Sequence, residues 1–487
     1  MGKLDPSRNQ LLAETRRHFF ARCSVGIGRI ALASLMSKEL MLSAERAPLL
    51  SPLAPKPPHF PARVKSVIYL YMAGGPSQFE LFDDKPGLRK LDGQPIPPSL
   101  LEGRRFAFMN ETLRNPILYA PRRKFQQYGQ SGKWVSECLP YLSQVVDDLA
   151  FINTVAVENP NHGPAAIFAN TGSPQFGRPS MGSWVTYGIG SESLDLPGFV
   201  VLLSGRYAPP GTPNTWLSGL LPTAHQGVRL LSGSVPIPDL PSPPGVSSQL
   251  QSETIETIKD LNLKRLANTG DPEIATRIAS YEMAYRMQTS GPELVDLSKE
   301  GPATLGLYGA EPGAKSFANN CLLARRLVER GVRFVQLYHS SWDSHGGPEE
   351  TLTHDFDRLC LETDRASAAL VLDLKQRGLL DETLVIWGGE FGRSPMGEFK
   401  DASVGRNHHI EAFPMWFAGG GVKRGQTIGQ TDEIGFSPVA DRVDIHDIHA
   451  TVLHLLGLDH KRLTFRSQGR DFRLTDVSGH VIQKLLA

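Results

Sequence analysis

The sequence predicts an α/β fold, with a mostly parallel central sheet lying between layers of helices. Two observations lead to this prediction. Several runs of aliphatic, β-branched and aromatic residues show no polar alternation, as is typical of strands covered on both faces. Helical patterns separate most of these runs, and an alternation of strands and helices is typical of parallel sheets.

The predicted elements follow one another along the chain. Five apolar runs contain the predicted strands, and they occupy residues 64–75, 148–157, 331–347, 382–393 and 413–421. Three helical patterns lie among or after them, at residues 318–330, 352–377 and 447–458. Polar residues able to bind metals come directly after several of these strands, where open α/β sheets build their sites. We therefore expect the functional site at the carboxyl edge of the sheet.

Residues 204–313 interrupt this alternation. The stretch 204–245 is rich in Gly, Pro and Ser, and the stretch 252–297 carries helical patterns. We expect an insertion or cap over the core here, with boundaries near 204 and 313. The whole globular domain is predicted to run from 64 to 487.

The first residues of the chain form a separate region. Arg16 and Arg17 precede an apolar segment that ends near Met36, and this arrangement resembles a twin-arginine export signal. We expect an export signal at 1–46, a Pro-rich linker at 47–63, and a protein of the periplasm or cell envelope. The alternative is an amphipathic helix with a basic face. The apolar run is short for a membrane span, so we expect membrane contact only through an uncleaved leader.

Composition excludes several classes of function. Lys and Arg together number 51 and Asp and Glu 50, so the net charge is +1 and no strongly basic field exists to attract nucleic acid. The cysteines, Cys23, Cys138, Cys321 and Cys360, show no CxxC pairing, which argues against a thiolate zinc site. We expect the three cysteines after the leader to be buried, inert thiols.

Two motifs after predicted strands carry candidate ligands. In WDSHGG, Asp343 and His345 lie two residues apart and can converge on one zinc or manganese ion. The alternative is a loop with a capping Asp and a solvated His. In WGGEFGR, Glu390 follows two glycines and Arg393 is able to hold an oxyanion. The alternative there is a salt-bridged Glu–Arg pair on a turn.

Two further motifs add histidines. GRNHHIEAFP places His408 and His409 next to each other in a predicted polar loop before a strand, and we expect His408 as a ligand with His409 behind it. NPNHGPAAIFANTG places Asn161 and His162 at a predicted helix start, where the helix dipole favours an anion. The alternative is a hydrogen-bonded loop histidine. Together the four motifs predict one site of carboxylates and imidazoles.

Several long motifs also occur in a characteristic order. These are MAGGPSQFELFDDKP, WDSHGG, LVIWGGEFGR, GRNHHIEAFPMWFAGGGVKRGQTIG and DIHATVLHLLGLDHKRLTFRSQGRDFRLTDV. From about Val64 to its end, the chain resembles the secreted bacterial family DUF1501. That family is placed among relatives of alkaline phosphatases, sulfatases and phosphoglycerate mutases, and it has no settled activity. The resemblance implies a mostly parallel sheet between helices and a two-metal site.

The resemblance transfers roles only one position at a time. In the wider superfamily a Ser, Thr or Cys nucleophile stands nine residues before a Thr-Gly pair, here Thr171-Gly172, and that position is His162. The hydroxyl or thiol nucleophile is therefore absent. The usual Asp after the first strand is replaced by Ala73-Gly74-Gly75, and Ser77, Glu80 and Asp83 are the nearby candidates to compensate.

The remaining ligand positions are better matched. Asp343 and His345 resemble a ligand pair with shortened spacing, and His408 matches the last His ligand. Glu390 keeps the carboxylate of an Asp-His pair, whereas Phe391 replaces its imidazole. The resemblance therefore implies one largely complete metal site and a second, reduced one.

Motifs and resemblance together predict a site of ten residues. The metal ligands are Asp343, His345, Glu390 and His408, the catalytic residues are His162 and Arg393, and the supporting residues are Ser77, Asp83, Asn161 and His409. We expect zinc, manganese or calcium. The predicted function is an exported hydrolase of phosphate or sulfate esters, with a small molecule or glycan as substrate. The alternative is a non-catalytic envelope protein that keeps the fold and one metal to bind carbohydrate or a protein partner.

Overall fold

The computed structural model describes residues 51–487 apart from 101, 103–115, 234, 238–244 and 401–402. The predicted export signal and the first residues of the predicted linker lie outside this part. From Ser51 onward the linker runs along the domain, because the N–H of Lys56 donates to the carbonyl of Ile189 at 3.0 Å. Among the described residues, no helix combines the length and the apolar run that crossing a membrane requires.

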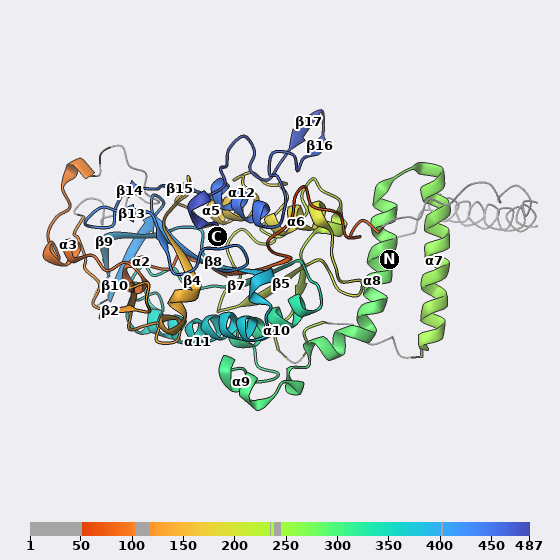
Figure 1. Ribbon diagram of the computed structural model, residues 1–487, viewed down its shortest axis with the longest axis horizontal. Coiled ribbons are helices and arrows are strands. Elements are labelled where there is room, and N and C mark those ends of the chain that lie inside the picture. Colours follow the sequence, from red (N-terminus) through yellow and green to blue (C-terminus); the bar gives the residue numbers. More distant parts are fainter. Residues whose placement is uncertain (1–50, 101, 103–115, 234, 238–244, 401–402) are drawn as a thin grey trace, which may run out of the picture. The chain divides into compact units, whose positions relative to one another are not determined.

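A central sheet of nine described strands forms the middle of the domain (Figure 1). The strands lie in the order β12-β4-β11-β8-β1-β7-β5-β6, and β15 pairs with β4. Their bounds are β1 Ser66–Met72, β4 Leu149–Ala156, β5 Phe199–Ser204, β6 Val228–Leu230, β7 Phe334–His339, β8 Thr383–Gly388, β11 Phe413–Gly419, β12 Thr427–Ile428 and β15 Val443–Asp444. Neighbours are parallel except that β11 runs antiparallel to β4 and β8. The predicted mostly parallel sheet is confirmed, and each of the five predicted apolar runs contributes a strand to it.

The helices alternate with these strands along the chain. Their bounds are α2 Gln78–Leu81, α3 Pro86–Lys90, α5 His162–Thr171, α6 Met181–Ile189, α7 Ser248–Thr269, α8 Pro272–Val295, α9 Pro302–Tyr308, α10 Phe317–Glu329, α11 His354–Gln376 and α12 Ile445–Leu455. Short 3-10 helices occupy Pro98–Leu100, Leu142–Asp148, Thr223–His225, Leu297–Lys299, Leu380–Glu382 and Gln483–Leu485. Two-stranded sheets pair β2 Phe125–Tyr128 with β3 Lys133–Ser136, β9 Gly392–Lys400 with β10 Ser403–His409, β13 Gln430–Thr431 with β14 Pro438–Ala440, and β16 Phe465–Ser467 with β17 Arg470–Phe472.

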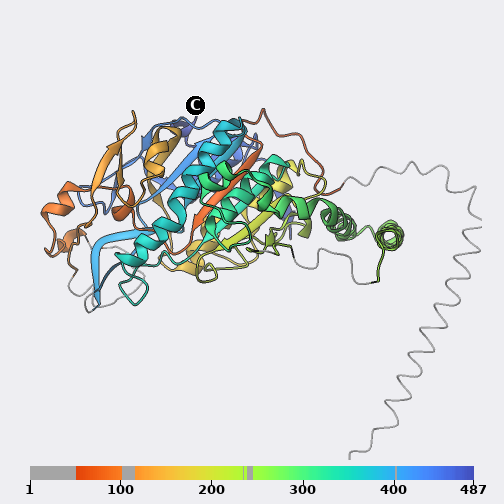
Figure 2. The same cartoon turned by 90° about the horizontal axis from the view of Figure 1, so that it is seen from below.

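Strand β1 explains why the predicted strands carry no polar alternation. Its alternate side chains point to opposite faces of the sheet, and every one of its residues is buried. Ile68 and Leu70 belong to a core that includes residues of α10 and α11. Val67 and Tyr69 belong to a second core that includes residues of α5, α6 and α12. Helices therefore cover both faces of the sheet, as Figures 1 and 2 show.

The carboxyl ends of the parallel strands meet at one edge. Met72, the last residue of β1, pairs with His339, the last residue of β7. Tyr71 pairs with Gly388, the last residue of β8. The loops that follow these three strands therefore begin side by side, and they carry the motifs from which the site was predicted.

The segment predicted as an insertion contains elements of two kinds. Strand β6 extends the central sheet and runs parallel to β5. Helices α7 and α8 pack against each other, and α8 also contacts α10 and the 3-10 helix at Thr223–His225. The segment is thus joined to the sheet at its beginning and carries a helical pair farther along.

One local prediction was wrong. His408 and His409 lie in strand β10, not in a polar loop. β10 forms an antiparallel hairpin with β9, in which His408 pairs with Arg393, and an irregularity in the register lies between Arg406 and His408. The polar sequence is strand because the partner β9 supplies the backbone hydrogen bonds, a tertiary effect that local propensity does not report.

Candidate metal centre

Four side chains from three segments of the chain bring their donor atoms together. They are His162, Asp343, His345 and His408, and one ligand atom of each lies within 4.8 Å of those of the others. Nε2 of His345 is 2.9 Å from Oδ1 of Asp343, and Nε2 of His408 is 3.3 Å from the same oxygen. Nε2 of His162 is 3.1 Å from Oδ2 of Asp343. The carboxylate of Asp343 therefore lies between three imidazoles.

Each of these imidazoles is oriented through its other nitrogen. Nδ1 of His162 is 2.7 Å from Oε1 of Glu390, and Nδ1 of His408 is 2.7 Å from the carbonyl oxygen of Pro160. Nδ1 of His345 bonds to the carboxylate of Glu398. An acceptor at Nδ1 holds the ring and directs Nε2, which is how metal-binding histidines are commonly supported.

The donor set fits a metal ion. Bonds of about 2.0–2.1 Å from imidazole nitrogen place neighbouring donors of a tetrahedral zinc ion about 3.3 Å apart. The Nε2 atoms of His162, His345 and His408 lie 3.1, 2.9 and 3.3 Å from a carboxylate oxygen of Asp343. Imidazole and carboxylate donors suit zinc or manganese, and the site has no thiolate.

Burial and mutual charge set the protonation of the cluster. Burial opposes the charged form of His162, but its hydrogen bonds to Asp343 and Glu390 raise its pKa to about 9. Burial likewise opposes ionisation of Asp343, but the charge of Arg393 and the neighbouring imidazoles hold its pKa well below the ordinary value. Burial lowers the pKa of His408 to about 3. At neutral pH the cluster thus contains a carboxylate and a neutral His408, the forms that bind metals. Burial opposes the charged form of His345, but its hydrogen bonds to Asp343 and Glu398 raise its pKa, so a metal that binds this ring would displace a proton.

Arg393 is fully buried behind the cluster. Its N–H groups donate to the carbonyl oxygens of Gly74, Gly75 and Arg406 and to Oδ1 of Asp343, so Nε and both terminal nitrogens have protein acceptors. The geometry therefore supports a positioning role for Arg393 beside Asp343, in place of the expected direct contact with an oxyanion.

Glu390 is also fully buried and lies behind His162 rather than among the four donors. Its Oε1 accepts the N–H of Gly74 at 2.8 Å in addition to its bond with His162. Gly74 has a φ of +118°, and a Cβ there would lie 2.7 Å from the backbone nitrogens of Trp342 and Asp343. The loops after β1 and β7 approach so closely that only glycine fits at position 74, which excludes an Asp from that position.

The four predicted supporting residues lie in different places and contact different parts of the chain. Asn161 is the N-cap residue of α5, directly before His162. Ser77 bonds to Glu80, and Asp83 pairs with Lys85 at 3.2 Å. Nε2 of His409 is 2.6 Å from the carbonyl oxygen of Phe436. Neighbouring residues of a strand point to opposite faces, so His409 turns away while His408 joins the cluster.

A cavity of about 160 Å³ opens beside the cluster. His162 and Asp343 line it from the side of the donor set. Tyr207, from the beginning of the predicted insertion, lines it together with Ser341 and Glu349 from the loop after β7. A small group entering this cavity would reach His162 and Asp343 directly.

Comparison with known proteins gives one family. The family model described as "Protein of unknown function (DUF1501)" matches residues 64–486. No curated protein matches the chain.

Several solved structures are similar at low identity. The chain is 12% identical to the PsFucS1 sulfatase from Pseudoalteromonas sp., with a TM-score of 0.38 and 87% of this chain and 72% of that chain covered. It is 12% identical to the lipoteichoic acid synthase LtaP from Listeria monocytogenes, with a TM-score of 0.35 and coverage of 87% and 78%. The alkaline phosphatase from the Antarctic bacterium TAB5 is 9% identical, with a TM-score of 0.33 and coverage of 82% and 99%. At such low TM-scores the likeness carries no argument about activity.

Proposed function

The chain belongs to the DUF1501 family, whose description gives no function, and from its site we propose that it is a metal-dependent hydrolase of phosphate or sulfate esters. One observation carries this proposal. Three imidazole Nε2 atoms converge on the carboxylate of Asp343 beside a cavity, and each ring is held through Nδ1. A divalent metal bound there would polarise an ester oxygen and stabilise the charge that develops on it.

We assign the metal to Asp343, His345 and His408. Three protein ligands with one open position are typical of catalytic zinc sites. Arg393 supports this set because its guanidinium lies 2.5 Å from Oδ1 of Asp343 and holds that carboxylate in place. Glu398 and the carbonyl of Pro160 do the same for the two histidine rings.

We assign proton transfer to His162. Hydrolysis breaks the P–O or S–O bond of the ester, water supplies the new oxygen atom, and the leaving oxygen must take up a proton. His162 lines the cavity, and the buried carboxylate of Glu390 at its Nδ1 favours the protonated ring that such a donor needs. His162 also begins helix α5, whose positive N-terminal end favours an anionic group.

A second function is supported by a different aspect of the same geometry. Nε2 of His162 belongs to the set of four donors that lie within 4.8 Å of one another. If all four bind the metal, the tetrahedral shell is complete, as in structural sites. The protein would then be a non-catalytic binding protein stabilised by one metal, with carbohydrate or a protein partner as its ligand.

One experiment separates these two functions. Metal content and turnover of 4-nitrophenyl phosphate and 4-nitrophenyl sulfate are measured side by side on the wild type and on His162→Ala. For the hydrolase we expect turnover to be lost while metal content is unchanged. Loss of metal together with turnover would make His162 a ligand, and absence of metal-dependent turnover in the wild type would contradict the hydrolase. His409→Ala is the matched control, because His409 bonds to Phe436.

We also propose that the protein is exported and acts on a small-molecule or glycan ester. The twin arginines Arg16 and Arg17 before an apolar segment support export. Replacing both with Lys keeps the charge but removes the pair that the export receptor reads. We expect the double variant to remain in the cytoplasm, as measured by cell fractionation, and its normal arrival in the envelope would contradict export by this route.

A further inference from the structure

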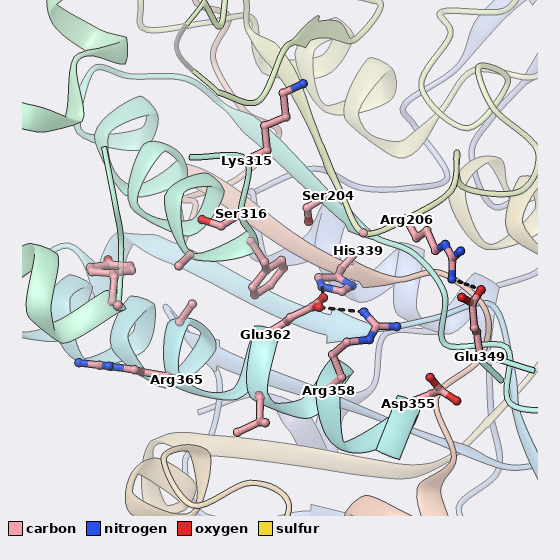
Figure 3. Close-up of a pocket in the computed structure, with 17 residues that line it drawn as sticks. Ser204, Arg206, Lys315, Ser316, His339, Glu349, Asp355, Arg358, Glu362 and Arg365 are labelled. Atoms are coloured by element: carbon pink, nitrogen blue, oxygen red, sulfur yellow. Dashed lines mark hydrogen bonds and ion pairs between the residues drawn. The ribbon is translucent and has the colours of Figure 1, made fainter. Parts of the chain in front are cut away.

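A second and larger cavity opens at the same edge of the sheet (Figure 3). Its volume is about 730 Å³, within the range of about 300–1,000 Å³ that small-molecule sites occupy. Ser204 and His339, the last residues of β5 and β7, pair with each other in the sheet and form its floor. Helix α11 and the beginning of α10 supply residues to its walls, among them Arg358 and Phe317.

This cavity adjoins the one beside the metal centre. Glu349 lines both cavities. Arg206 lines the larger cavity, and the next residue, Tyr207, lines the smaller one. Gly205 of the larger cavity packs tightly against Ser340 of the smaller one, since a Cβ added to Gly205 would lie 2.6 Å from the backbone nitrogen of Ser340. Arg206 and Glu349 form an ion pair, at the right in Figure 3.

The larger cavity holds one more basic side chain than carboxylates. Its basic side chains are Arg206, Lys315, Arg358 and Arg365, and its carboxylates are Glu349, Asp355 and Glu362. Among the described residues, Lys315 makes no ion pair, and the guanidinium of Arg358 makes its one hydrogen bond to Glu362, at 2.8 Å through Nη1. Arg358, whose side chain is 43% exposed, therefore keeps N–H groups that a ligand can accept in place of water.

The floor of the cavity contains a pair between the buried His339 and the partly exposed Glu362. Nε2 of His339 is 3.0 Å from Oε2 of Glu362, and His339 is 1% exposed. The hydrogen bond to His339, together with the one to Arg358, lowers the pKa of Glu362 even though burial opposes it. Because His339 holds one carboxylate oxygen of Glu362, removal of Arg358 would leave that carboxylate with a partner.

We propose that this cavity binds an anionic group of the substrate whose ester is cleaved at the metal centre. The proposal rests on the proposed hydrolase function and deepens it. A substrate that crosses the Arg206–Glu349 pair has its ester beside His162 and a second sulfate or phosphate group in the larger cavity, which Arg358 and Lys315 line from different sides (Figure 3). The substrate class is therefore a chain that carries more than one sulfate or phosphate ester. A guanidinium whose N–H groups are not all hydrogen-bonded to the protein suits such oxyanions, because it can bind them bidentately.

The test compares a double variant of the cavity with a matched control. Lys315→Gln/Arg358→Gln removes two cations from the cavity, and Lys264→Gln/Arg265→Gln removes the same two residue types from the exposed surface of α7. Calorimetry measures the binding of tripolyphosphate, a sulfated hexasaccharide and neutral maltohexaose to each full-length protein, kept in EDTA so that no turnover consumes the probe. We expect the cavity variant to bind one anionic probe roughly tenfold more weakly, with the control unchanged. Weaker binding of tripolyphosphate would indicate a phosphate site, and weaker binding of the sulfated hexasaccharide would indicate a sulfate site.

Other results would overturn the proposal. These are equal binding by the cavity variant and the wild type, no binding of either anionic probe by the wild type, or equally tight binding of maltohexaose. Arg358→Lys tests the role of charge, since it should retain most of the affinity if the cation matters and the variant is folded. A wild type without metal-dependent turnover of 4-nitrophenyl esters would refute the hydrolase, whereas the binding measurements would still decide whether the cavity holds anions.

Discussion

The guanidinium of Arg393 lies 2.5 Å from Oδ1 of Asp343, the same oxygen that faces Nε2 of His345 and of His408. Arg393 is fully buried, and its pair with Asp343 connects the start of the β9–β10 hairpin to the loop after β7. The cation therefore compensates the charge of the ligand carboxylate from the side opposite the cavity.

The first prediction concerns this pair. Arg393→Met should lower the free energy of unfolding by at least about 2 kcal/mol, because it removes the buried hydrogen bonds that the guanidinium donates to the carbonyl oxygens of Gly75 and Arg406, together with its pair with the partly exposed Asp343. Urea unfolding in EDTA measures the effect without a metal. Arg424→Met is the control, since the pair of Arg424 with Asp381 is solvent-exposed and such pairs contribute about 0–1 kcal/mol. Equal losses in the two variants would contradict a structural role for the buried pair.

The second prediction concerns the carboxylates that orient the histidines. Glu398→Gln should weaken metal binding about 10- to 100-fold, since Glu398 holds Nδ1 of a ligand histidine. Glu390→Gln should leave metal affinity near the wild-type value and reduce turnover, because Glu390 holds His162. Competition with a chelator measures the affinity. Glu382→Gln, whose carboxylate pairs with Lys65 at the surface, should change neither quantity.

The third prediction concerns backbone strain beside the metal centre. Ser341 has a φ of +83°, which only glycine adopts readily, and its hydroxyl is buried without a hydrogen-bond partner among the described residues. Ser341→Gly should therefore raise the free energy of unfolding by about 1 kcal/mol, as measured by thermal or urea unfolding. Ser344→Gly, at a buried position of the same loop without a positive φ, should destabilise instead. A destabilised Ser341→Gly would show that the hydroxyl makes a contact worth more than the strain.

The fourth prediction concerns pH. Burial lowers the pKa of His449 to about 3, whereas the unfolded chain titrates near 6.5. Between these values only the unfolded chain takes up the proton, so stability falls as pH falls below about 6.5, by at most about 1.4 kcal/mol per pH unit from this residue. His449→Gln keeps an N–H for the carbonyl of Ala169 and cannot be protonated.

The measurement is urea unfolding of this variant across the acidic range. His449→Gln should lose less stability on acidification than the wild type. His480→Gln, at a side chain that is 92% exposed, should keep the wild-type dependence on pH. Identical acid sensitivity in all three proteins would mean that His449 does not contribute.

Much of the fold follows from the sequence because helices cover both faces of the central sheet. Strands such as β1 and β8 are therefore continuous apolar runs, which are visible without knowledge of their partners. Strands β6 and β10 escaped prediction for the opposite reason. β6 is three residues long, and β10 is polar and depends on β9 for its hydrogen bonds.

The residues of the site also fall into those that the sequence predicts and those that it does not. Asp343, His345 and His408 were found because their motifs follow or precede apolar strands whose ends meet at one edge. Glu398 and the carbonyl of Pro160 were missed, since their roles arise only when distant segments fold against the histidine rings. Asp83 was a candidate by its distance along the chain from the first strand, but spacing alone does not fix the direction of a side chain, and it pairs with Lys85.

The four donors of the cluster come from three distant places along the chain, at positions 162, 343 and 345, and 408. An ion held by them would act as a noncovalent crosslink among three distant stretches of polypeptide. The unfolded chain cannot assemble these donors cheaply, so the ion would bind the native state in preference and stabilise it by mass action. Cys138, Cys321 and Cys360 are free thiols, so no disulfide among them supplies such a constraint. Chelation should therefore lower the free energy of unfolding of the domain.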